Sequence, residues 1–399
     1  MIVKIDRLSH DFRGITKFND KVTFVSDAIP GEVVDVRIIS SKKNINEGKV
    51  LSHIEKSCDR VIPKCPYYGE CGGCDISFIK YDKALEYKRN IVINIMKRYA
   101  GIDANPDIIC DNNIYGYRNK ISLKVNNNKL ALVKEGSNEC INIDKCLLVN
   151  EQFNKIIKLL NETDLTTVKE VIIKGTYEIM VIVYGDIDCE LLINTLKDYV
   201  STILLNDKVI YGNDYINISV SNFKYAVYPK SFFQINTGMI SKLYDKIKEY
   251  AGNGNRLLDL YCGAGTIGIY LASNFKYVYG IEVNSDAVEG ANLNRKINNI
   301  GNINFECKKA SELENNNYDV VVVDPPRAGL DNVTISKLLD SESDRIVYVS
   351  CNPITLARDI KLLSDKYEVC DMTLFDMFPN TKHVESVVLL SRVGVSVET

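Results

Sequence analysis

The chain has 399 residues, of which 46% are hydrophobic and 25% charged, a balance typical of globular proteins and long enough for two or three domains. Its formal net charge of −3 gives no general attraction to nucleic acid, so any RNA contact must come from local patches. The N-terminal MIVKIDRLSH is unlike a signal peptide, and no apolar run is long enough to span a membrane, so we expect a cytoplasmic protein. The twelve cysteines then indicate thiols, metal ligands or catalysis rather than disulfides.

Residues 1–56 alternate short β-rich runs with turn residues, as in KVTFV, EVVDVRII and GKVLSHIE, and this pattern predicts a small β-barrel. The segment holds ten Lys and Arg residues against eight Asp and Glu, so it is slightly basic within an acidic chain. The run RGITKF at residues 13–18, followed by AIPGEVVDVRI, resembles a TRAM domain, a small RNA-binding β-barrel found beside RNA-modifying enzymes.

A dense group of cysteines follows in CPYYGECGGC. Three thiols lie within ten residues, with glycines between them that let the backbone fold around a centre: Cys65, Cys71 and Cys74. This density predicts a metal site, and Cys146 in NIDKCLLV is the preferred fourth ligand, with Cys140 and Cys58 as competitors. Thiolates bind zinc as well as iron–sulfur clusters, so the residues alone leave the metal open.

Residues 57–227 are expected to form a central α/β domain around this site. Within it, residues 78–98 have the periodicity of one amphipathic helix with a basic, solvated face. Two hairpin strands follow, where Tyr115, Tyr117 and Arg118 could stack on RNA bases. Helix and strand patterns then alternate to the end of the domain, which is the signature of an α/β fold.

Residues 228–399 carry the densest set of motifs. The run RLLDLYCGAGTIGIYLA predicts a strand, a glycine-rich turn and a helix, with Gly263, Gly265 and Gly268 in a G-x-G-x-x-G pattern. Glu282 ends the next predicted strand, YVYGIE, near the offset of an acid that binds ribose hydroxyls. This arrangement predicts a Rossmann-like α/β domain that binds NAD or S-adenosylmethionine.

Two further predicted strands end in polar residues. YDVVVVDPPR carries Asp324 in a rigid Pro-Pro turn, and RIVYVSCNP ends in Cys351. Asn352 suits a helix N-cap and Pro353 the first helical position, so Cys351 should lie near a helix N-terminus that favours its thiolate. Because ligands of open α/β sheets bind at the carboxyl ends of the strands, we expect the cofactor, Asp324 and Cys351 to share one crevice.

A thiol beside a methyl donor makes chemical sense when the target is a ring carbon. Carbon C5 of uracil is a poor nucleophile, but addition of the Cys351 thiolate at C6 makes an enolate whose C5 can attack a methylsulfonium. A base must then remove the C5 proton, and Glu385 in HVESVVLL is the candidate because burial would raise its pKa. His383 could orient Glu385, although a structural role is the commoner one for such a histidine. The target base must be unpaired or flipped to be reached.

Together these residues resemble the RNA uracil-5-methyltransferase family, and specifically its ribosomal-RNA branch, which has an N-terminal TRAM domain and a [4Fe-4S] cluster. The resemblance runs over essentially the whole chain and is carried by CPYYGECGGC, FFQIN, LDLYCGAGTIG, DPPRAG, YVSCNPITLARD and HVES. It implies Cys351 as the nucleophile and Glu385 as the base. It further implies cluster ligands at Cys65, Cys71, Cys74 and Cys146, and S-adenosylmethionine contacts at Gln234, Tyr261, Glu282 and Asp324.

The tRNA-directed branch of that family usually lacks both the TRAM domain and the cluster, so 23S rRNA is favoured over tRNA as the substrate. A tRNA uracil-5-methyltransferase is the first alternative. A non-catalytic RNA-binding iron–sulfur protein is the second, and it would not bind S-adenosylmethionine. The cluster is expected to be structural, because the proposed methyl transfer needs no electron. A monomer is favoured, and the sequence leaves the oligomeric state open.

Overall fold

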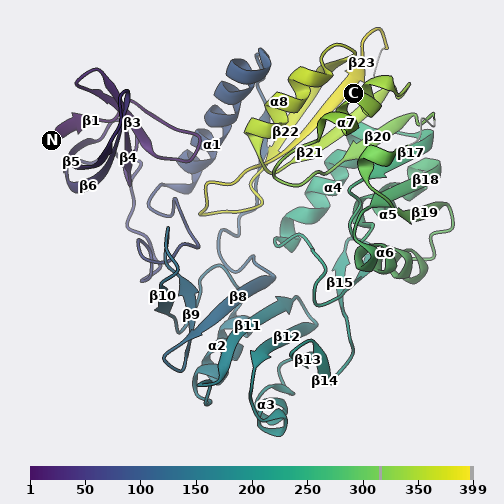
Figure 1. Ribbon diagram of the computed structural model, residues 1–399, viewed down its shortest axis with the longest axis horizontal. Helices are drawn as coiled ribbons and strands as arrows, with labels where there is room; N and C mark the ends of the chain where they lie inside the picture. Colours follow the sequence, from purple (N-terminus) through teal and green to yellow (C-terminus); the bar gives the residue numbers. More distant parts are fainter. Residues whose placement is uncertain (314–316, 396–399) are drawn as a thin grey trace.

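The structure is a computed structural model that describes residues 1–313 and 317–395, and it has three lobes (Figure 1). The N-terminal lobe, in purple, lies beside the C-terminal domain, in green to yellow, and the central domain, in blue to teal, lies below both. The N-terminus is at the outer edge of the first lobe. Among the described residues, no helix combines the length and apolar character needed to cross a membrane.

Six strands form the N-terminal lobe in the order β1-β5-β6-β4-β3-β2. Their bounds are β1 Ile2–Lys4, β2 Arg7–Leu8, β3 Gly14–Phe18, β4 Lys21–Ser26, β5 Val33–Ser41 and β6 Ile45–Glu55. Asn19 and Asp20 have φ angles of 49° and 59°, the left-handed conformation of a two-residue hairpin turn. Ile5, Val25 and Val34 belong to the buried core between the strands. The strand pattern predicted for this segment is confirmed, and we call the lobe the barrel.

An apolar contact and a buried ion pair hold the barrel against the residues that follow it. Phe12 and Ile29 of the barrel pack in one cluster with Phe78. Arg60 Nε donates to Glu32 Oε1 at 2.6 Å, and the Glu32 side chain is 0% exposed. Burial alone would raise the pKa of Glu32, but the hydrogen bonds from Arg60 hold that pKa below its usual value. The buried Glu32 carboxylate of the barrel is therefore neutralised and hydrogen-bonded by Arg60, and this contact holds the barrel in place.

The central domain is built on a seven-stranded sheet in the order β10-β9-β8-β11-β12-β13-β14, antiparallel except for the pair β12 and β13. Helices α2 Glu151–Asn161 and α3 Cys189–Leu196 pack their apolar residues into the same core as the sheet. The strands are β8 Lys120–Asn126, β9 Lys129–Val133, β10 Cys140–Asn142, β11 Val168–Gly175, β12 Ile179–Gly185, β13 Thr202–Leu205 and β14 Lys208–Tyr211.

The C-terminal domain contains an eight-stranded sheet in the order β19-β18-β17-β20-β21-β23-β22-β7. Strands β17 to β21 are parallel, and β23 runs antiparallel to both neighbours. The strands are β7 Asp107–Ile109, β17 Gly254–Leu260, β18 Phe275–Glu282, β19 Ile303–Cys307, β20 Val320–Val323, β21 Arg345–Ser350, β22 Tyr367–Phe375 and β23 Glu385–Arg392. The predicted Rossmann-like domain is therefore present.

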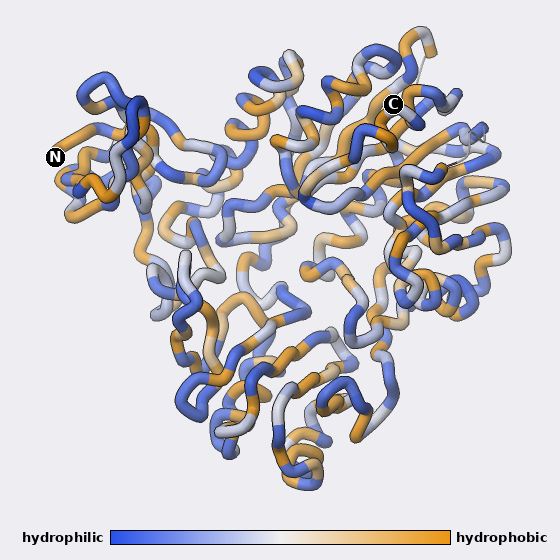
Figure 2. The backbone as a smooth tube through the Cα atoms, in the orientation of Figure 1, coloured by the Kyte–Doolittle hydropathy of each residue, from blue (hydrophilic) through white to orange (hydrophobic). Residues whose placement is uncertain are grey.

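Helices cover both faces of this sheet. The apolar residues of α4 Thr237–Ala251 and α5 Thr266–Leu271 pack in one core, and those of α1 Tyr81–Ile95, α7 Asn332–Asp340 and α8 Pro353–Leu363 pack in a second. Helix α6 Ser285–Ile297 lies beside α5 and β19. The strands between these layers are hydrophobic along most of their length (Figure 2), as expected for a sheet buried on both faces.

Residues from the predicted central domain take part in the C-terminal domain. Strand β7 pairs in parallel with β22, and helix α1 contacts α8. The hairpin of β15 Ile216–Val220 and β16 Phe223–Val227 packs in the same core as α4. The single boundary expected at residue 228 therefore differs from the structure. A three-residue strand such as β7 has too little pattern to reveal its partner in the sequence.

A buried ion pair joins α1 to the C-terminal sheet. Lys88 Nζ lies 2.5 Å from Asp376 Oδ1, and the two side chains are 1% and 0% exposed. Lys88 also donates to the carbonyl of Phe378 at 3.3 Å, and the Tyr81 hydroxyl donates to Asp376 at 2.7 Å. Each charge thus has a partner across the two segments, as a buried charge requires.

Replacing Lys88 with methionine should lower the free energy of unfolding by about 3–5 kcal/mol, because the Asp376 carboxylate stays buried without its counter-ion. Denaturant unfolding of the full chain measures the change. The matched control is Lys97→Met on the same part of the chain, since Lys97 is 67% exposed and pairs with an exposed Asp103. That change should cost less than about 1 kcal/mol. Equal losses in the two variants would contradict a stabilising role for the buried pair.

Candidate active site

The glycine-rich loop lies between β17 and α5. Gly263 and Gly265 have φ angles of 53° and 75°, the left-handed region that favours glycine. At Gly268 a Cβ atom would lie 2.9 Å from the Asp259 carboxylate. Any larger residue at this position would therefore push α5 away from β17. Gly263 N donates to Glu282 Oε2 at 3.1 Å, which ties the loop to the end of β18. The predicted strand–turn–helix motif is confirmed.

A cavity of about 600 Å³ opens beside this loop, which we call the cofactor cavity. It lies at the carboxyl ends of β17, β18 and β20, where the strand order changes direction and ligands of such sheets bind. Its lining includes all four residues that the resemblance assigned to the methyl donor: Gln234, Tyr261, Glu282 and Asp324. An acid at the end of β18 suits ribose hydroxyls, and the bare glycine backbone permits close approach, so these residues fit S-adenosylmethionine.

Cys351 follows the last residue of β21 and precedes α8, as the sequence predicts. The Asn352 side chain accepts from Ile354 N, and Pro353 occupies the first turn of α8. Asn352 Nδ2 also donates to the carbonyl of Arg327 at 3.0 Å, and this bond joins the loop after β21 to the loop after β20. The thiol is therefore fixed on a rigid junction of two strands.

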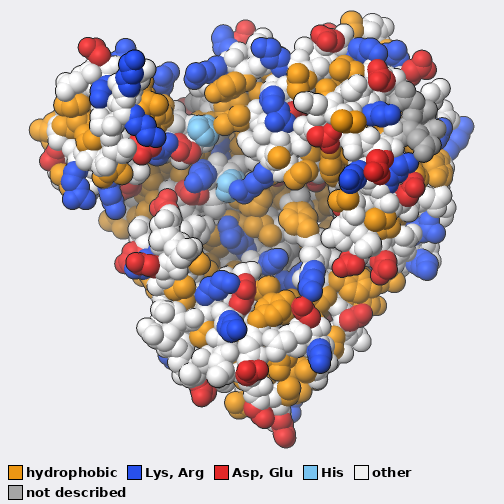
Figure 3. All heavy atoms as spheres, viewed as in Figure 1, with side chains coloured by type: hydrophobic (Ala, Val, Ile, Leu, Met, Phe, Trp, Pro, Cys, Tyr) orange, Lys and Arg blue, Asp and Glu red, His pale blue; other side chains and the backbone are white. Residues whose placement is uncertain are grey.

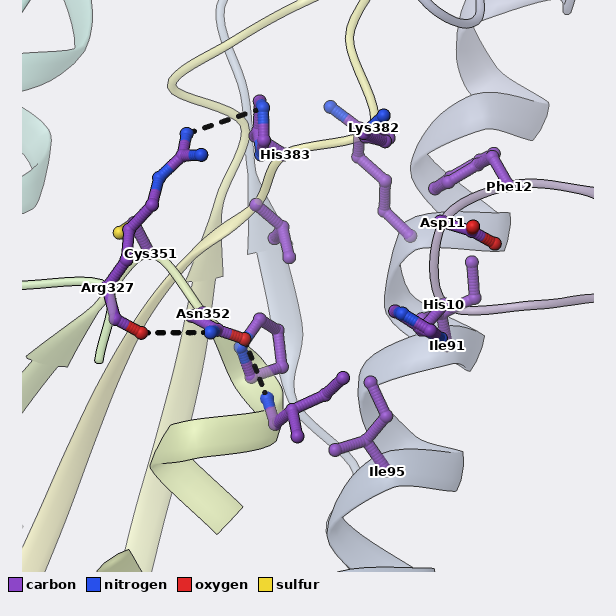
Figure 4. A pocket seen from close by; sticks show the side chains of 14 residues that line it. His10, Asp11, Phe12, Ile91, Ile95, Arg327, Cys351, Asn352, Lys382 and His383 are labelled. Carbon is purple, nitrogen blue, oxygen red and sulfur yellow. Dashed lines mark hydrogen bonds between the residues drawn. The ribbon is translucent and has the colours of Figure 1, made fainter. Parts of the chain in front are cut away.

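Cys351 lines a second cavity, of about 300 Å³, rather than the cofactor cavity (Figure 4). We call it the thiol cavity; besides the loops of the C-terminal domain, its walls come from the barrel and from α1. They include His10, Asp11 and Phe12 from the barrel and Lys88, Ile91 and Ile95 from α1. The space-filling view shows the hollow between barrel and C-terminal domain, with histidine side chains inside it (Figure 3). Cys351 and Asp324 thus line two different cavities, and the charge of Asp324 still acts on the Cys351 thiol.

Glu385 and Asp324 form a pair of interacting carboxyl groups, of which Asp324 lines the cofactor cavity. Glu385 is the first residue of β23 and is 3% exposed. Burial, and then the charge of Asp324, raises the pKa of Glu385 well above its usual value. Burial also raises the pKa of Asp324. Two carboxyl groups in such surroundings resist losing both protons, so one of them holds a proton near neutral pH.

The thiol of Cys351 is harder to ionise than the sequence suggests. Burial raises the pKa of Cys351, the charges of Glu385 and Asp324 raise it further, and only the nearby Arg327 guanidinium lowers it among the main charged neighbours. Any support that the helix N-terminus gives to the thiolate is thus opposed by burial and by two carboxyl groups in the protein without its substrates. The carboxyl groups come from other strands, and the local sequence around Cys351 does not reveal them.

Arg327 was missed as a site residue, although it stands in the DPPR motif. Its Nη2 lies 3.5 Å from His383 Nε2 (Figure 4). Burial and the charge of Arg327 lower the pKa of His383 to about 4, so the imidazole is neutral near pH 7. His383 therefore faces Arg327, and it is Arg327 whose charge reaches both Cys351 and Glu385.

The four predicted cluster cysteines come together in the central domain. One small cavity is lined by all of them, Cys65, Cys71, Cys74 and Cys146. Neither competitor, Cys58 or Cys140, belongs to its lining, and Cys58 is exposed. Among the described residues, no group of three or more histidine, cysteine or acidic side chains has the geometry to hold a single metal ion.

The predicted base-stacking residues point elsewhere. Tyr117 is 7% exposed and its hydroxyl donates to the carbonyl of Pro379 at 2.9 Å. Arg118 lines the cysteine cavity, where its Nε is buried without a hydrogen-bond partner. Tyr115 lines the same cavity. Stacking on RNA is therefore not the role of Tyr117 or Arg118, because both are turned into the protein.

A Rossmann-like sheet with this loop and a fitting cavity defines a methyltransferase fold, here joined to a small barrel. The family model described as tRNA (uracil-5-)-methyltransferase matches residues 196–315 and 303–393, and the TRAM domain model matches residues 1–51. An uncharacterized RNA methyltransferase of Halalkalibacterium halodurans is 33% identical over 440 residues, which span 97% of this chain and 96% of that protein. One of Staphylococcus aureus is 34% identical over 435 residues, spanning 96% of each chain.

A solved structure agrees with these matches. The crystal structure of Pyrococcus abyssi tRNA (uracil-54, C5)-methyltransferase in complex with S-adenosyl-L-homocysteine has a TM-score of 0.81 and 29% sequence identity, covering 98% of this chain and 100% of that one. The chain belongs to the RNA uracil-5-methyltransferase family and is an S-adenosylmethionine-dependent enzyme.

The electrostatics around Cys351 can be tested by alkylation. Arg327→Leu should raise the pH at which iodoacetamide reacts half-maximally with Cys351, because the thiolate loses its cationic neighbour. Glu385→Gln should lower that pH, because it removes a negative charge. Mass spectrometry of the Cys351 peptide reads the midpoint, and the exposed Cys370 serves as an internal control that should not move. Identical Cys351 midpoints in all three proteins would contradict the electrostatic account.

Proposed function

We propose that the protein transfers a methyl group from S-adenosylmethionine to C5 of a uridine in RNA, with 23S rRNA as the favoured substrate. One observation carries the proposal: the Cys351 thiol, which lines the thiol cavity beside Arg327 (Figure 4), is also acted on by the charges of Glu385 and of Asp324, and Asp324 lines the cofactor cavity. Cys351 lines the thiol cavity and Asp324 the cofactor cavity, so a flipped uracil in the thiol cavity would have the methyl donor behind it.

In the proposed reaction, the Cys351 thiolate forms a bond to C6 of the uracil, and the electron pair of the C5–C6 double bond moves toward C5 and the C4 carbonyl. S-adenosylmethionine supplies an electrophilic methyl group when bound. Arg327 stabilises the thiolate before attack, and Glu385 accepts the C5 proton after C5 carries the methyl group. That proton loss restores the double bond and expels Cys351. The raised pKa of Glu385 makes its carboxylate a stronger base than an exposed one.

The choice of RNA rests on the resemblance to the ribosomal-RNA branch. The comparison with the Pyrococcus abyssi protein supports tRNA as a second candidate, because that protein is named for uracil-54 of tRNA and matches 98% of this chain. A match of that extent includes most of the barrel and of the cysteine segment. The presence of the barrel and the cysteine segment therefore does not decide between 23S rRNA and tRNA as the substrate, and both RNAs must be tested.

The enzyme should form a stable adduct with 5-fluorouridine RNA in the presence of S-adenosylmethionine, because Glu385 cannot remove fluorine from C5. Gel mobility of the protein with fluorinated 23S rRNA and tRNA transcripts measures the adduct and ranks the substrates. Cys351→Ala should give none. With ordinary RNA, Glu385→Gln should accumulate the adduct and turn over about 10² to 10⁴ times more slowly, the range for a lost general base.

Active wild-type enzyme without any adduct would overturn this mechanism, as would an equal adduct in Cys351→Ala. The non-catalytic alternative predicts that S-adenosylmethionine does not bind. Calorimetric binding to the wild type, lost in Glu282→Ala, would exclude that alternative without any RNA.

We further propose that the cysteine cavity holds a [4Fe-4S] cluster with a structural role. Four thiols from two segments line the cavity, and the buried Nε of Arg118 lies there without a partner, as expected if an anionic group completes the site. Thiolates bind zinc as well as iron–sulfur clusters, and the choice of a cluster rests on the resemblance to the ribosomal-RNA branch.

Cys71→Ser should lose iron and acid-labile sulfide on anaerobic purification, because a ligand is removed. Cys140→Ser is the matched control and should keep both, since Cys140 does not line the cavity. Elemental analysis with the visible absorbance spectrum measures the content. Zinc in place of iron, or equal iron in the two variants, would contradict the assignment.

A further inference from the structure

The wall of the cofactor cavity between β16 and α4 is an irregular segment whose backbone is bound by the central domain. This segment, residues 228–236, lies outside any strand or helix, and residues 228–234 line the cavity. We call it the wall segment. Buried carbonyls without secondary structure need donors from elsewhere. In this molecule the donors that reach the wall segment from the central domain belong to Lys174 and Asn119.

Lys174 binds three backbone carbonyls of the wall segment. Its Nζ donates to the carbonyls of Tyr228 at 2.9 Å, Pro229 at 3.3 Å and Ser231 at 3.1 Å. Lys174 itself is 3% exposed and lies near the end of β11, opposite Lys120 of β8. Three donors of one ammonium group are thus used on three carbonyls, which satisfies the full donor capacity of lysine.

Asn119 binds the part of the wall segment that carries the cofactor contact. Asn119 Nδ2 donates to the carbonyl of Gln234 at 2.8 Å, and its backbone N–H donates to the carbonyl of Ile235 at 2.9 Å. The carbonyl of Asn119 in turn accepts from Gly175 N at 2.8 Å, so Asn119 and Lys174 are held together at the same end of the paired strands β8 and β11. Five carbonyls of the wall segment are therefore fixed by neighbouring donors.

We infer that Lys174 and Asn119 are positioning residues of the methyl-donor site, which set cofactor affinity by holding the wall segment in the shape of the cavity. The inference rests on the proposed use of this cavity for S-adenosylmethionine. The central domain then contributes to cofactor binding without touching the cofactor. Phe232, which is 73% exposed, and Gln234 are carried by the same segment, so their placement depends on the same five bonds.

The charge of Lys174 gives this role a pH signature. Burial lowers the pKa of Lys174 to about 7, and the positive charge of Lys120 acts in the same direction. Lys120 lies opposite Lys174 across the β8–β11 pair and is the charged side chain that acts on it. The protonated amine offers three donors and the neutral amine two, so the hold on the wall segment weakens as the pH rises through about 7.

The test is calorimetric binding of S-adenosylhomocysteine to the purified full chain. Lys174→Met should weaken binding on the order of tenfold or more, the equivalent of losing charge-assisted hydrogen bonds. Lys174→Arg should restore part of the affinity. The matched control is Lys169→Met, the same substitution at an exposed position of the same strand, and it should bind as the wild type does.

Two further readouts separate positioning from a purely structural role. Wild-type affinity should fall between pH 6 and 8 more than that of Lys174→Met, which has no ammonium to lose. If Lys174→Met does not fold, Asn119→Asp tests the same idea, because it keeps the shape of the side chain and replaces the donor to Gln234 with an acceptor. That variant should also bind the ligand on the order of tenfold more weakly.

Wild-type affinity in folded Lys174→Met or Asn119→Asp would overturn the inference, even if their melting temperatures fell. A wild-type protein that does not bind S-adenosylhomocysteine would instead overturn the proposed use of the cavity. The two failures are therefore distinguishable.

Discussion

The candidate site depends on the free-energy cost of burying several ionisable side chains close to one another. Asp324, Cys351 and Glu385 come from the ends of three strands, and burial raises the pKa of each, with the charge of a neighbouring carboxyl group raising the pKa of Cys351 and Glu385 further. Arg327 is the cation that acts on both Cys351 and Glu385. With the thiol protonated and one proton held by the two carboxyl groups, the empty site carries little unpaired negative charge. A substrate that stabilises the thiolate changes that balance only when it is bound.

Three parts of the chain must be in place before this site is complete. The barrel and α1 supply walls of the thiol cavity, and the buried pair of Lys88 and Asp376 fixes α1 on the C-terminal sheet. The central domain holds the wall segment on the cofactor side. The candidate active site is thus an assembly of all three lobes around the carboxyl ends of one sheet, and the barrel contributes directly to one of its cavities.

Local features were predictable where neighbouring residues decide them. The strand–turn–helix around Gly263 and the N-cap at Asn352 follow from side-chain size and backbone hydrogen bonding within a few residues. The grouping of Cys65, Cys71 and Cys74 was also predictable, because glycine and cysteine density is a local signal, whereas density could not single out Cys146, which is distant in sequence, from Cys140 and Cys58. The ionisation of Cys351 was not, since Glu385 and Arg327 act on it across strands. The roles of β7 and Lys174 likewise depend on partners distant in sequence.

The pairing of β7 with β22 has a consequence for the order of folding during synthesis. In sequence order, α1 and β7 come before the strands of the central domain, and β22, the partner of β7, comes near the end of the chain. Strand β7 therefore leaves the ribosome long before its partner exists, and the sheet closes only when the last strands emerge. The central domain is in effect an insertion in the catalytic one. A fragment that begins at residue 228 would expose the edge of β22, and unpaired edges of this kind favour aggregation.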